Sequence, residues 1–401
     1  MLLVAAGCGV AAQTSGPDLR ALVDNRQWFE LRDAVDAANA PVFFHLVVSC
    51  VFDDVRRAEA SLTRLIGSAA QSPDVFAAHG MLASAHMRAG HYSQVLSHLR
   101  AMQASRPDFG GLTGAIALFT ALGAYPEPAV SRRRSSQVRM TEDMFLPVSI
   151  DERPANYGFD TGMDLSVMSE TEARRLGLAI HVVAGSEFQD GASGIRTGIR
   201  FVIANRLLLG DFEIAHVPFL VVSREAMPFV ELPADKQGIL GYPVLRTFET
   251  IRWDRTRAFQ VGFESASKRP TPNMCVPGNS TPVVDGRHGT RRITLGLDTG
   301  SSRTFLTPRF ARDFPGVVEQ SAKKESTLLR GLGGSTAVDV NTLPELALCA
   351  GGFDFMLRPA QVLPPDPSVE RDTYHVWAGM DILAQPRRIT LDFRSMWFAA
   401  E

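Results

Sequence analysis

The spacing of hydrophobic residues divides the chain into two parts. In residues 17–125, apolar positions recur every three or four residues, as in RALVDNRQWFELRDAVDAA and FAAHGMLASAHMRAGHYSQVLSHLRAMQ, which predicts amphipathic helices. Ala89-Gly90 interrupts the second of these stretches, so a helix–turn–helix is expected there. After Pro126, short apolar runs such as GIRFVIA, VPFLVV and RRITLDF alternate with turn residues, which predicts β-strands.

The helical part carries a periodic signal. Pro73-Asp74 and Pro107-Asp108 close successive helical stretches 34 residues apart. This period resembles tetratricopeptide repeats, and a generic helical bundle is the alternative. The match includes Ala83, Gly90, Leu99 and Pro107, whereas Val95 stands where a small residue is usual.

Four histidines lie in the same helices: His79, His86, His91 and His98. Within each helix the two are seven residues apart, so they share a face but are separated by two turns, too far for one metal ion. We therefore expect hydrogen-bonded or solvent-facing histidines and no metal site.

The β-rich part is internally repeated. Asp160-Thr161-Gly162 has a second copy, Asp298-Thr299-Gly300, 138 residues later. A single such tripeptide is weak evidence, because Asp and Gly are common in turns. The same offset, however, relates further pairs, which indicates two copies of one unit: Ser169 and Thr307, each expected to begin a short helix, Gly241 and Gly379, and Ile251–Asp254 and Ile389–Asp392.

These features resemble retropepsin-like aspartic proteases, and their duplication resembles the two-lobed pepsin-type enzymes. The resemblance covers roughly residues 140–398. It rests on both D-T-G motifs, Leu176-Gly177-Leu178, a glycine-rich turn in each copy, and the segments Ile239-Leu240-Gly241 and Trp377-Ala378-Gly379. It implies a multidomain α + β chain, with an N-terminal α-helical repeat domain followed by two homologous all-β acid-protease lobes. The expected domains are 17–125 (tetratricopeptide-like helices), 126–139 (linker), 140–265 (lobe 1) and 266–401 (lobe 2).

The resemblance also implies the chemistry. Two close carboxylates cannot both ionise cheaply, so Asp160 and Asp298 would share one proton, one activating water and the other polarising the peptide carbonyl. The residues expected to support them are Thr161 and Thr299, bracing the loops, Gly162 and Gly300, admitting backbone N–H groups, and Ser301, whose hydroxyl would bond Asp298. Sequence does not say which aspartate is the base.

Two further elements of the site follow from the resemblance. Gly191–Gly194 and Gly331–Gly334 are candidate flap tips that would close over an extended polypeptide. Met163 departs from the usual Ala or Ser after D-T-G, which predicts an asymmetric site and raises the alternative of a weakened lobe.

The predicted function is an aspartic endopeptidase with a monomeric active site, no metal and no cofactor. The alternative is a pseudoprotease, catalytically weak or inactive, that binds peptides as a scaffold, with protein partners held by the helical repeats. No G-x-S-x-G elbow and no H-E-x-x-H motif occur in the sequence, which argues against serine-hydrolase and zinc-protease chemistry.

Composition adds limits on partners. With 45% hydrophobic and 21% charged residues, the chain is typical of soluble globular proteins. The net charge of −2 gives no reason to expect nucleic acid or acidic lipid, and the basic run Arg132-Arg133-Arg134 is interpreted as a solvated linker. Four scattered cysteines do not fit a disulfide framework or zinc site; buried free thiols are expected, with a Cys275–Cys349 pair as the alternative.

The first 16 residues form an apolar segment followed by polar residues. Ala5-Ala6-Gly7-Cys8 resembles the cleavage box of bacterial lipoprotein signals, although a positive n-region is missing and the apolar stretch is short. It predicts a truncated lipoprotein signal in residues 1–16, with Cys8 as lipidation candidate. Membrane association would then occur only through a lipid anchor, at an extracytoplasmic (periplasmic or outer-membrane) location.

Overall fold

The computed structural model describes residues 17–37, 39–70, 72–189, 196–265, 271–321, 323–331, 334–365 and 373–401. Cys8, and with it the predicted signal at 1–16, lies outside these residues, as do Gly191 and Gly194. Among the described residues, no helix is both long and apolar enough to cross a membrane.

The N-terminal part is helical, as predicted. Local signals explain the clearest hairpin: Ser72 caps one helix with Pro73 in its first turn, and Gly90 ends it at a left-handed φ of 76°. The hairpin partner follows at once and packs against it. The helical layer comprises α1 (Leu19–Asp24), α2 (Trp28–Ala37), α3 (Val42–Val51), α4 (Val55–Ala69), α5 (Pro73–Ala89), α6 (Tyr92–Ser105) and α7 (Leu112–Leu122). Whether it is a tetratricopeptide array stays a prediction.

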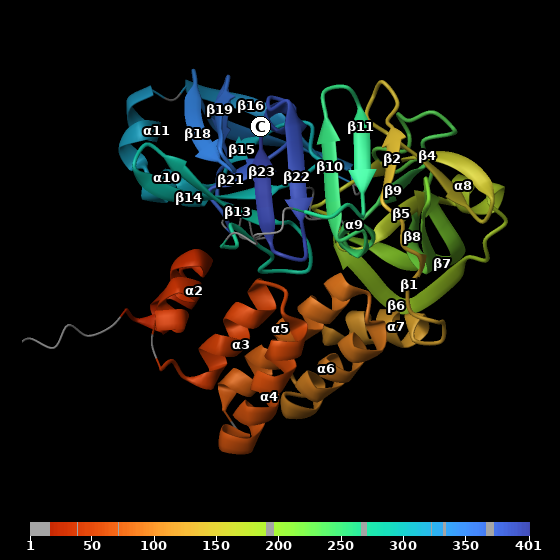
Figure 1. Cartoon of the computed structure of the whole chain (residues 1–401), viewed down its shortest axis with the longest axis horizontal. Coiled ribbons are helices and arrows are strands. Elements are labelled where there is room, and N and C mark those ends of the chain that lie inside the picture. The colour runs from red at the N-terminus through yellow and green to blue at the C-terminus, as the bar shows by residue number, and fades with distance from the viewer. Residues whose placement is uncertain are drawn as a thin grey trace, which may run out of the picture.

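Two β-rich lobes lie above the helical layer (Figure 1). The sheet of lobe 1 has the order β1-β8-β5-β9-β4-β3-β7-β6. Its strands are β1 (Ala129–Arg132), β3 (Leu146–Ile150), β4 (Arg153–Phe159), β5 (Ser166–Ser169), β6 (His181–Gln189), β7 (Arg196–Leu209), β8 (Phe212–Val222) and β9 (Gly238–Leu240), with helices α8 (Glu170–Arg175) and α9 (Tyr242–Thr247).

Lobe 2 repeats this plan. Its sheet has the order β16-β17-β20-β15-β21-β14-β13-β18-β19, and β12 pairs with β13. Its elements are β12 (Met274–Cys275), β13 (Val283–His288), β14 (Arg291–Leu297), β15 (Phe305–Leu306), β16 (Lys323–Gly331), β17 (Gly334–Leu343), β18 (Leu346–Ala350), β19 (Phe353–Leu357), β20 (Ala360–Val362) and β21 (Val376–Ala378), with helices α10 (Pro308–Asp313), α11 (Pro315–Ser321) and α12 (Met380–Leu383).

A third sheet joins the lobes, with the order β2-β11-β10-β22-β23. Its central pair is antiparallel and includes Ile251 opposite Leu391 and Arg252 opposite Thr390 (Figure 1). The two segments that the sequence repeat relates therefore lie side by side at the lobe boundary. The strands are β2 (Ser136–Arg139), β10 (Thr250–Asp254), β11 (Ala258–Val261), β22 (Arg388–Asp392) and β23 (Trp397–Ala400).

The segment 126–139, predicted as a linker, is largely strand. β1 pairs with β8, and β2 pairs with β11. The linker prediction was wrong because polar side chains on edge strands face water and leave no apolar run to recognise. The side chains of Arg133 and Arg134 are exposed, as expected of a solvated charge run.

The predicted helix starts and thiols can be compared with the structure. Ser169 caps α8 by accepting the Glu172 N–H at 3.2 Å, as the capping signal predicts. Thr307 precedes α10, but its hydroxyl donates to the carbonyl of Tyr374 instead of capping the helix. The three described cysteines are free, with Cys50 and Cys275 buried, so the alternative Cys275–Cys349 bond is not formed.

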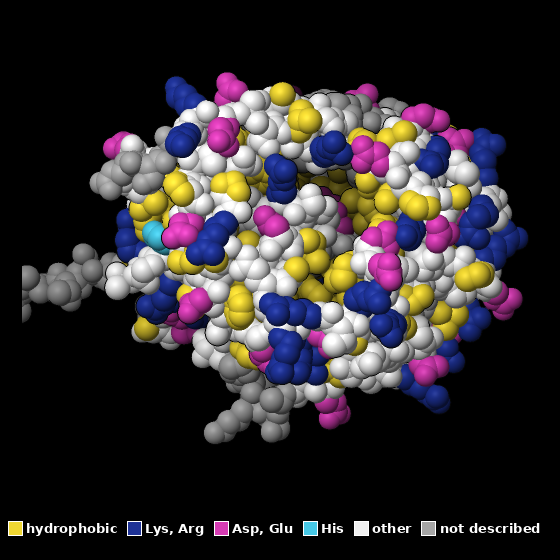
Figure 2. All heavy atoms as spheres, turned by 90° about the horizontal axis from the view of Figure 1, so that it is seen from above, with side chains coloured by type: hydrophobic (Ala, Val, Ile, Leu, Met, Phe, Trp, Pro, Cys, Tyr) yellow, Lys and Arg dark blue, Asp and Glu magenta, His cyan; other side chains and the backbone are white. Residues whose placement is uncertain are grey.

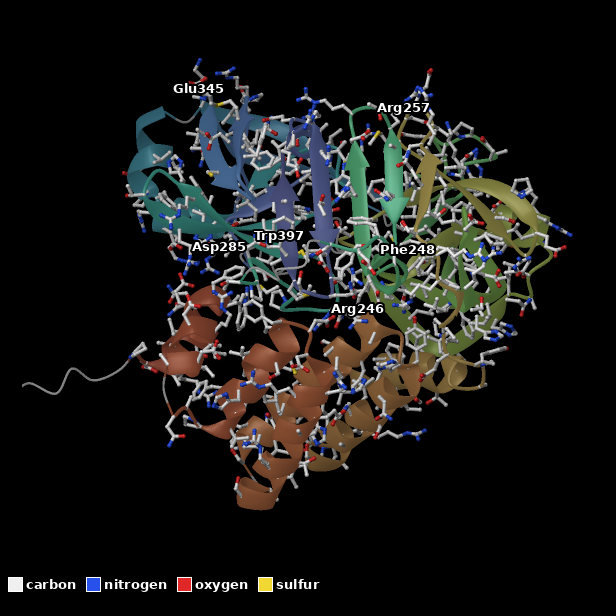
Figure 3. The ribbon with its side chains drawn as sticks, in the orientation of Figure 1. Arg246, Phe248, Arg257, Asp285, Glu345 and Trp397 are labelled. Atoms are coloured by element: carbon white, nitrogen blue, oxygen red, sulfur yellow. The ribbon has the colours of Figure 1, made fainter. Side chains whose placement is uncertain are left out.

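The helical layer shares apolar cores with both lobes. One core combines α2–α5 with Cys275 and Val283 of lobe 2. Another combines α5–α7 with Leu165 and Phe201 of lobe 1. Charged residues also lie along this border, including Arg246 and Asp285, which Figure 3 labels. The helices therefore form part of the packed body of the protein.

Candidate active site

The two D-T-G segments follow equivalent strands. Asp160 comes directly after β4, which pairs in parallel with β9, and Asp298 lies just beyond β14, which pairs in parallel with β21. The backbone N–H of Asp160 donates to the Leu240 carbonyl, and that of Asp298 to the Ala378 carbonyl, both at 2.9 Å. Each aspartate is thus fixed at the end of a strand by the same hydrogen bond.

A glycine beyond each of these partner strands lets the site close up. A Cβ atom on Gly241 would lie 2.6 Å from the backbone carbon of Leu165, and one on Gly379 would lie 2.3 Å from the carbonyl oxygen of Arg303. Both contacts are far inside van der Waals range. Only glycine therefore allows these segments to pack against the chain that follows each D-T-G motif.

Two buried threonines connect the loops across the lobe interface. The Thr161 hydroxyl donates to the Leu297 carbonyl at 2.6 Å and accepts the Thr299 N–H at 3.1 Å. The Thr299 hydroxyl donates to the Phe159 carbonyl at 2.8 Å and accepts the Thr161 N–H at 3.0 Å. These four reciprocal hydrogen bonds hold the two loops at one relative position.

This bracing brings the carboxyl groups of Asp160 and Asp298 close together, each beside the glycine of the other motif. Asp160 Oδ1 accepts the Gly162 N–H at 2.7 Å, and Asp298 Oδ1 accepts the Gly300 N–H at 3.0 Å. A Cβ atom on Gly300 would lie 2.1 Å from Asp160 Oδ2. The close approach of the Asp160 carboxyl therefore requires glycine at position 300, whereas a Cβ atom on Gly162 would lie 3.0 Å from the carboxyl carbon of Asp298, a tight contact.

The two aspartates have different hydrogen-bond donors. Asp298 also accepts the Ser301 N–H at 3.1 Å, and its Oδ2 accepts a short hydrogen bond from the indole N–H of Trp377. The Ser301 hydroxyl donates to the Arg303 carbonyl at 2.7 Å, so the expectation that it bonds Asp298 was wrong. Trp377 on β21 makes the outer hydrogen bond in its place.

These donors act differently on the pKa of the two carboxyls. Burial and the neighbouring Asp298 carboxylate raise the pKa of Asp160 well above its usual range. Burial also raises the pKa of Asp298, but hydrogen bonds from Trp377, Asp160 and two backbone N–H groups oppose this rise. The arrangement favours a protonated Asp160 that donates to an ionised Asp298.

Met163 stands in lobe 1 where lobe 2 has Ser301, directly after the D-T-G motif. Its side chain packs against the apolar cluster of Val167, Val222 and Phe229, which also contacts Ile239. Ile239 is the lobe-1 counterpart of Trp377, and like Met163 it has no side-chain donor. The asymmetry predicted from Met163 is thus accompanied by a second one on β9 and β21.

A β-hairpin in each lobe corresponds to the expected flaps. In lobe 1 it is β6–β7, whose tip lies outside the described residues. In lobe 2 it is β16–β17, where Gly331 pairs with Gly334. Arg330, beside this tip, forms an ion pair at 3.1 Å with Glu231 of lobe 1. From above, a hollow with hydrophobic walls opens between the lobes (Figure 2).

The segment between the lobes adds contacts that sequence did not indicate. Ser280 Oγ lies 2.9 Å from the Gly162 carbonyl and 2.7 Å from Asp164 Oδ1, and the Thr281 N–H donates to the Thr161 carbonyl at 2.8 Å. In sequence this stretch stands out only as a formal glycosylation acceptor, Asn279-Ser280-Thr281. In the structure it supports the lobe-1 loop from outside.

A family model matches part of lobe 1. Residues 146–244 match the family model described as aspartyl protease, which confirms the predicted resemblance for lobe 1. Among solved structures, a retropepsin-like aspartic protease from Rickettsia conorii matches at 14% sequence identity, with 33% of this chain and 91% of that chain covered and a TM-score of 0.22. No match was found among curated proteins.

Proposed function

We propose that this protein is an aspartic endopeptidase whose two lobes supply one catalytic aspartate each, Asp160 and Asp298. The observation that carries the proposal is the pair of closely placed carboxyl groups, held by reciprocal threonine bonds and surrounded by different donors. Such a pair shares one proton and so combines an acid and a base in one site. The aspartyl protease family match over lobe 1 supports the same chemistry.

In this mechanism Asp298 is the base. A water molecule placed between the carboxyls gives a proton to Asp298 while its oxygen attacks the peptide carbonyl carbon. Asp160 gives its proton to the carbonyl oxygen, which yields a neutral tetrahedral diol. The C–N bond then breaks as Asp298 returns its proton to the leaving nitrogen and Asp160 recovers one from the diol. Both aspartates end in their starting states.

The substrate in this proposal is an extended polypeptide. The hollow between the lobes and the β-hairpin beside it suit a strand-like chain, which backbone hydrogen bonds would hold. Lipidation at Cys8, an extracytoplasmic location and partners on the helical layer stay predictions.

A peptide-binding scaffold without hydrolysis is the second candidate. Met163 favours it, because this side chain offers Asp160 no hydrogen bond and makes lobe 1 unlike its counterpart. Trp377 also occupies the outer oxygen of Asp298, where it either tunes the carboxylate or restricts access.

Cleavage of an unfolded protein substrate across pH 3 to 8 distinguishes the two candidates. The comparison uses the wild type, Asp160→Asn, Asp298→Asn and the exposed control Asp36→Asn, with folding checked by circular dichroism. The protease proposal expects cleavage by the wild type and the control and a loss of at least a thousandfold in both dyad variants. A folded wild type that binds the substrate by calorimetry but cuts at no pH would instead establish the scaffold.

A further inference from the structure

Five side chains gather between α4, α5 and α6, away from the paired aspartates. Glu59 of α4 lies between His86 of α5 and His98 of α6: its Oε1 is 2.7 Å from His86 Nε2 and 3.0 Å from His98 Nε2. Each of these imidazoles contacts another through Nδ1, His86 with His91 at 3.3 Å and His98 with His79 at 2.9 Å. The result is a continuous chain of four imidazoles around one carboxylate.

Hydrogen-bonded or solvent-facing histidines were expected, but their grouping around one carboxylate was not. Their seven-residue spacing within a helix does not bring them together. The α5–α6 hairpin does, because antiparallel helices place His86 opposite His91 near the turn and His79 opposite His98 further along. The histidine signal therefore lies across the hairpin, where spacing along one helix cannot detect it.

We propose that Glu59, His86 and His98 form a binding site for a divalent transition-metal ion, with Zn²⁺ as the ion that best fits the donors. The three ligand atoms lie within 4.8 Å of one another. In a tetrahedral zinc site with bonds of about 2.0–2.1 Å, donor atoms are about 3.3 Å apart. Small side-chain adjustments would reach this geometry, and a water molecule would complete the four ligands.

Protons and charge fit the same assignment. Two imidazoles and one carboxylate are a known ligand set for zinc, and nitrogen donors favour zinc over magnesium or calcium. An ion bound at Nε2 leaves Nδ1–H of His86 and His98 free to donate to His91 and His79. Such outer hydrogen bonds orient ligating histidines and increase their basicity.

The exposed fractions of the three ligands show where an ion could enter, and their positions on three helices indicate what it would do. The side chains of His86 and His98 are 7% and 8% exposed, whereas that of Glu59 is 37% exposed and faces the solvent side. A bound ion would connect three helices at the end of α5. Two residues after His86 in the same helix, the side chain of Arg88 donates to the carbonyl of Gly278 in the segment between the lobes. The inferred role is to fix the helical layer, separate from peptide hydrolysis.

Calorimetric titration of the chelator-treated full chain with Zn²⁺ tests the proposal. We expect one ion per chain and an unfolding temperature that rises with Zn²⁺ concentration. Glu59→Gln and His98→Gln should weaken binding at least a hundredfold and abolish the thermal shift, whereas His79→Gln should weaken it about tenfold. His288→Gln, which alters a half-buried histidine on β13 far from α4–α6 in sequence, should bind as the wild type does.

The proposal is overturned if the wild type binds no Zn²⁺, or if folded Glu59→Gln and His98→Gln variants bind it as tightly as the wild type. If either variant fails to fold, Co²⁺ in the wild type decides. Paramagnetically shifted imidazole signals from His86 and His98 support the site, and shifts confined to other histidines refute it. Retained binding by Asp298→Asn would separate this site from the paired aspartates and from the proposed protease activity.

Discussion

Trp377→Phe tests whether the indole hydrogen bond keeps Asp298 ionised. The substitution retains an aromatic ring beside Phe305 and Leu329, where Trp377 packs, and removes only the N–H that Asp298 Oδ2 accepts. The proposed base must be ionised to take a proton from water. Without this donor the pKa of Asp298 rises, and its ionised form is lost first at low pH.

The size of the effect follows from the type of hydrogen bond. A hydrogen bond to a charged group contributes about 1.5–3 kcal/mol. Since a tenfold change in protonation corresponds to about 1.4 kcal/mol, the acidic limb of the pH–rate profile should move upward by about one to two pH units. At a pH one unit below the wild-type limb, activity should fall at least tenfold. The basic limb reports proton loss from the pair as a whole and should move less.

The measurement is kcat/KM for an internally quenched peptide from pH 3 to 8, with circular dichroism on each variant. Trp28→Phe is the matched control, because Trp28 is buried in α2 and its indole nitrogen has no hydrogen-bond partner among the described residues. The control should keep the wild-type profile. An unchanged acidic limb in folded Trp377→Phe, or a limb displaced to lower pH, would refute the assignment of Asp298 as base.

Three further predictions concern the surroundings of the dyad. Arg88→Met leaves a buried carboxylate short of one partner and should destabilise the chain by about 3–5 kcal/mol in urea unfolding, against at most about 1 kcal/mol for the exposed control Arg20→Met. Thr161→Val removes two buried hydrogen bonds and should lower the free energy of unfolding by about 2–4 kcal/mol and abolish most of the activity. Thr161→Ser keeps the hydroxyl and should retain stability and activity; equal activity in the two variants would contradict the bracing role. Gly379→Ala places a Cβ atom against backbone and should lower the unfolding temperature and activity together, whereas Gly198→Ala, which meets open space, should change neither.

Repetition is what made the lobes predictable. The offset between the D-T-G motifs also relates Arg252 to Thr390, and these residues face each other in the joining sheet. Likewise Gly241 and Gly379 occupy equivalent tight contacts. A duplicated unit preserves backbone positions, so the sequence repeat indicated where equivalent segments would lie.

Side-chain reach was not predictable in the same way. Trp377 has Ile239 as its counterpart, so nothing in the repeat marks an indole as a donor to Asp298. Ser301 carried the expected hydroxyl, but that group bonds to Arg303 instead. A motif fixes where a residue lies on the backbone, whereas the rotamer and the nearest acceptor depend on packing between segments distant in sequence.

The helical layer illustrates the same limit at a larger scale. Its spacing predicted helices, but not that the segment between the lobes connects them to the proposed catalytic loop. Buried Arg88 donates to the carbonyls of Cys50 and Gly278, and its guanidinium pairs with Asp53. Shortly after Gly278, Thr281 donates its N–H to the carbonyl of Thr161. Since an arginine this buried is costly unless all its donors are used, these bonds fix the segment between the lobes relative to α5. The lobe-1 loop is therefore positioned from one side by Thr299 and from the other by a segment fixed to the helices. A helical domain that served only to recruit partners would need neither this arginine nor the shared apolar cores.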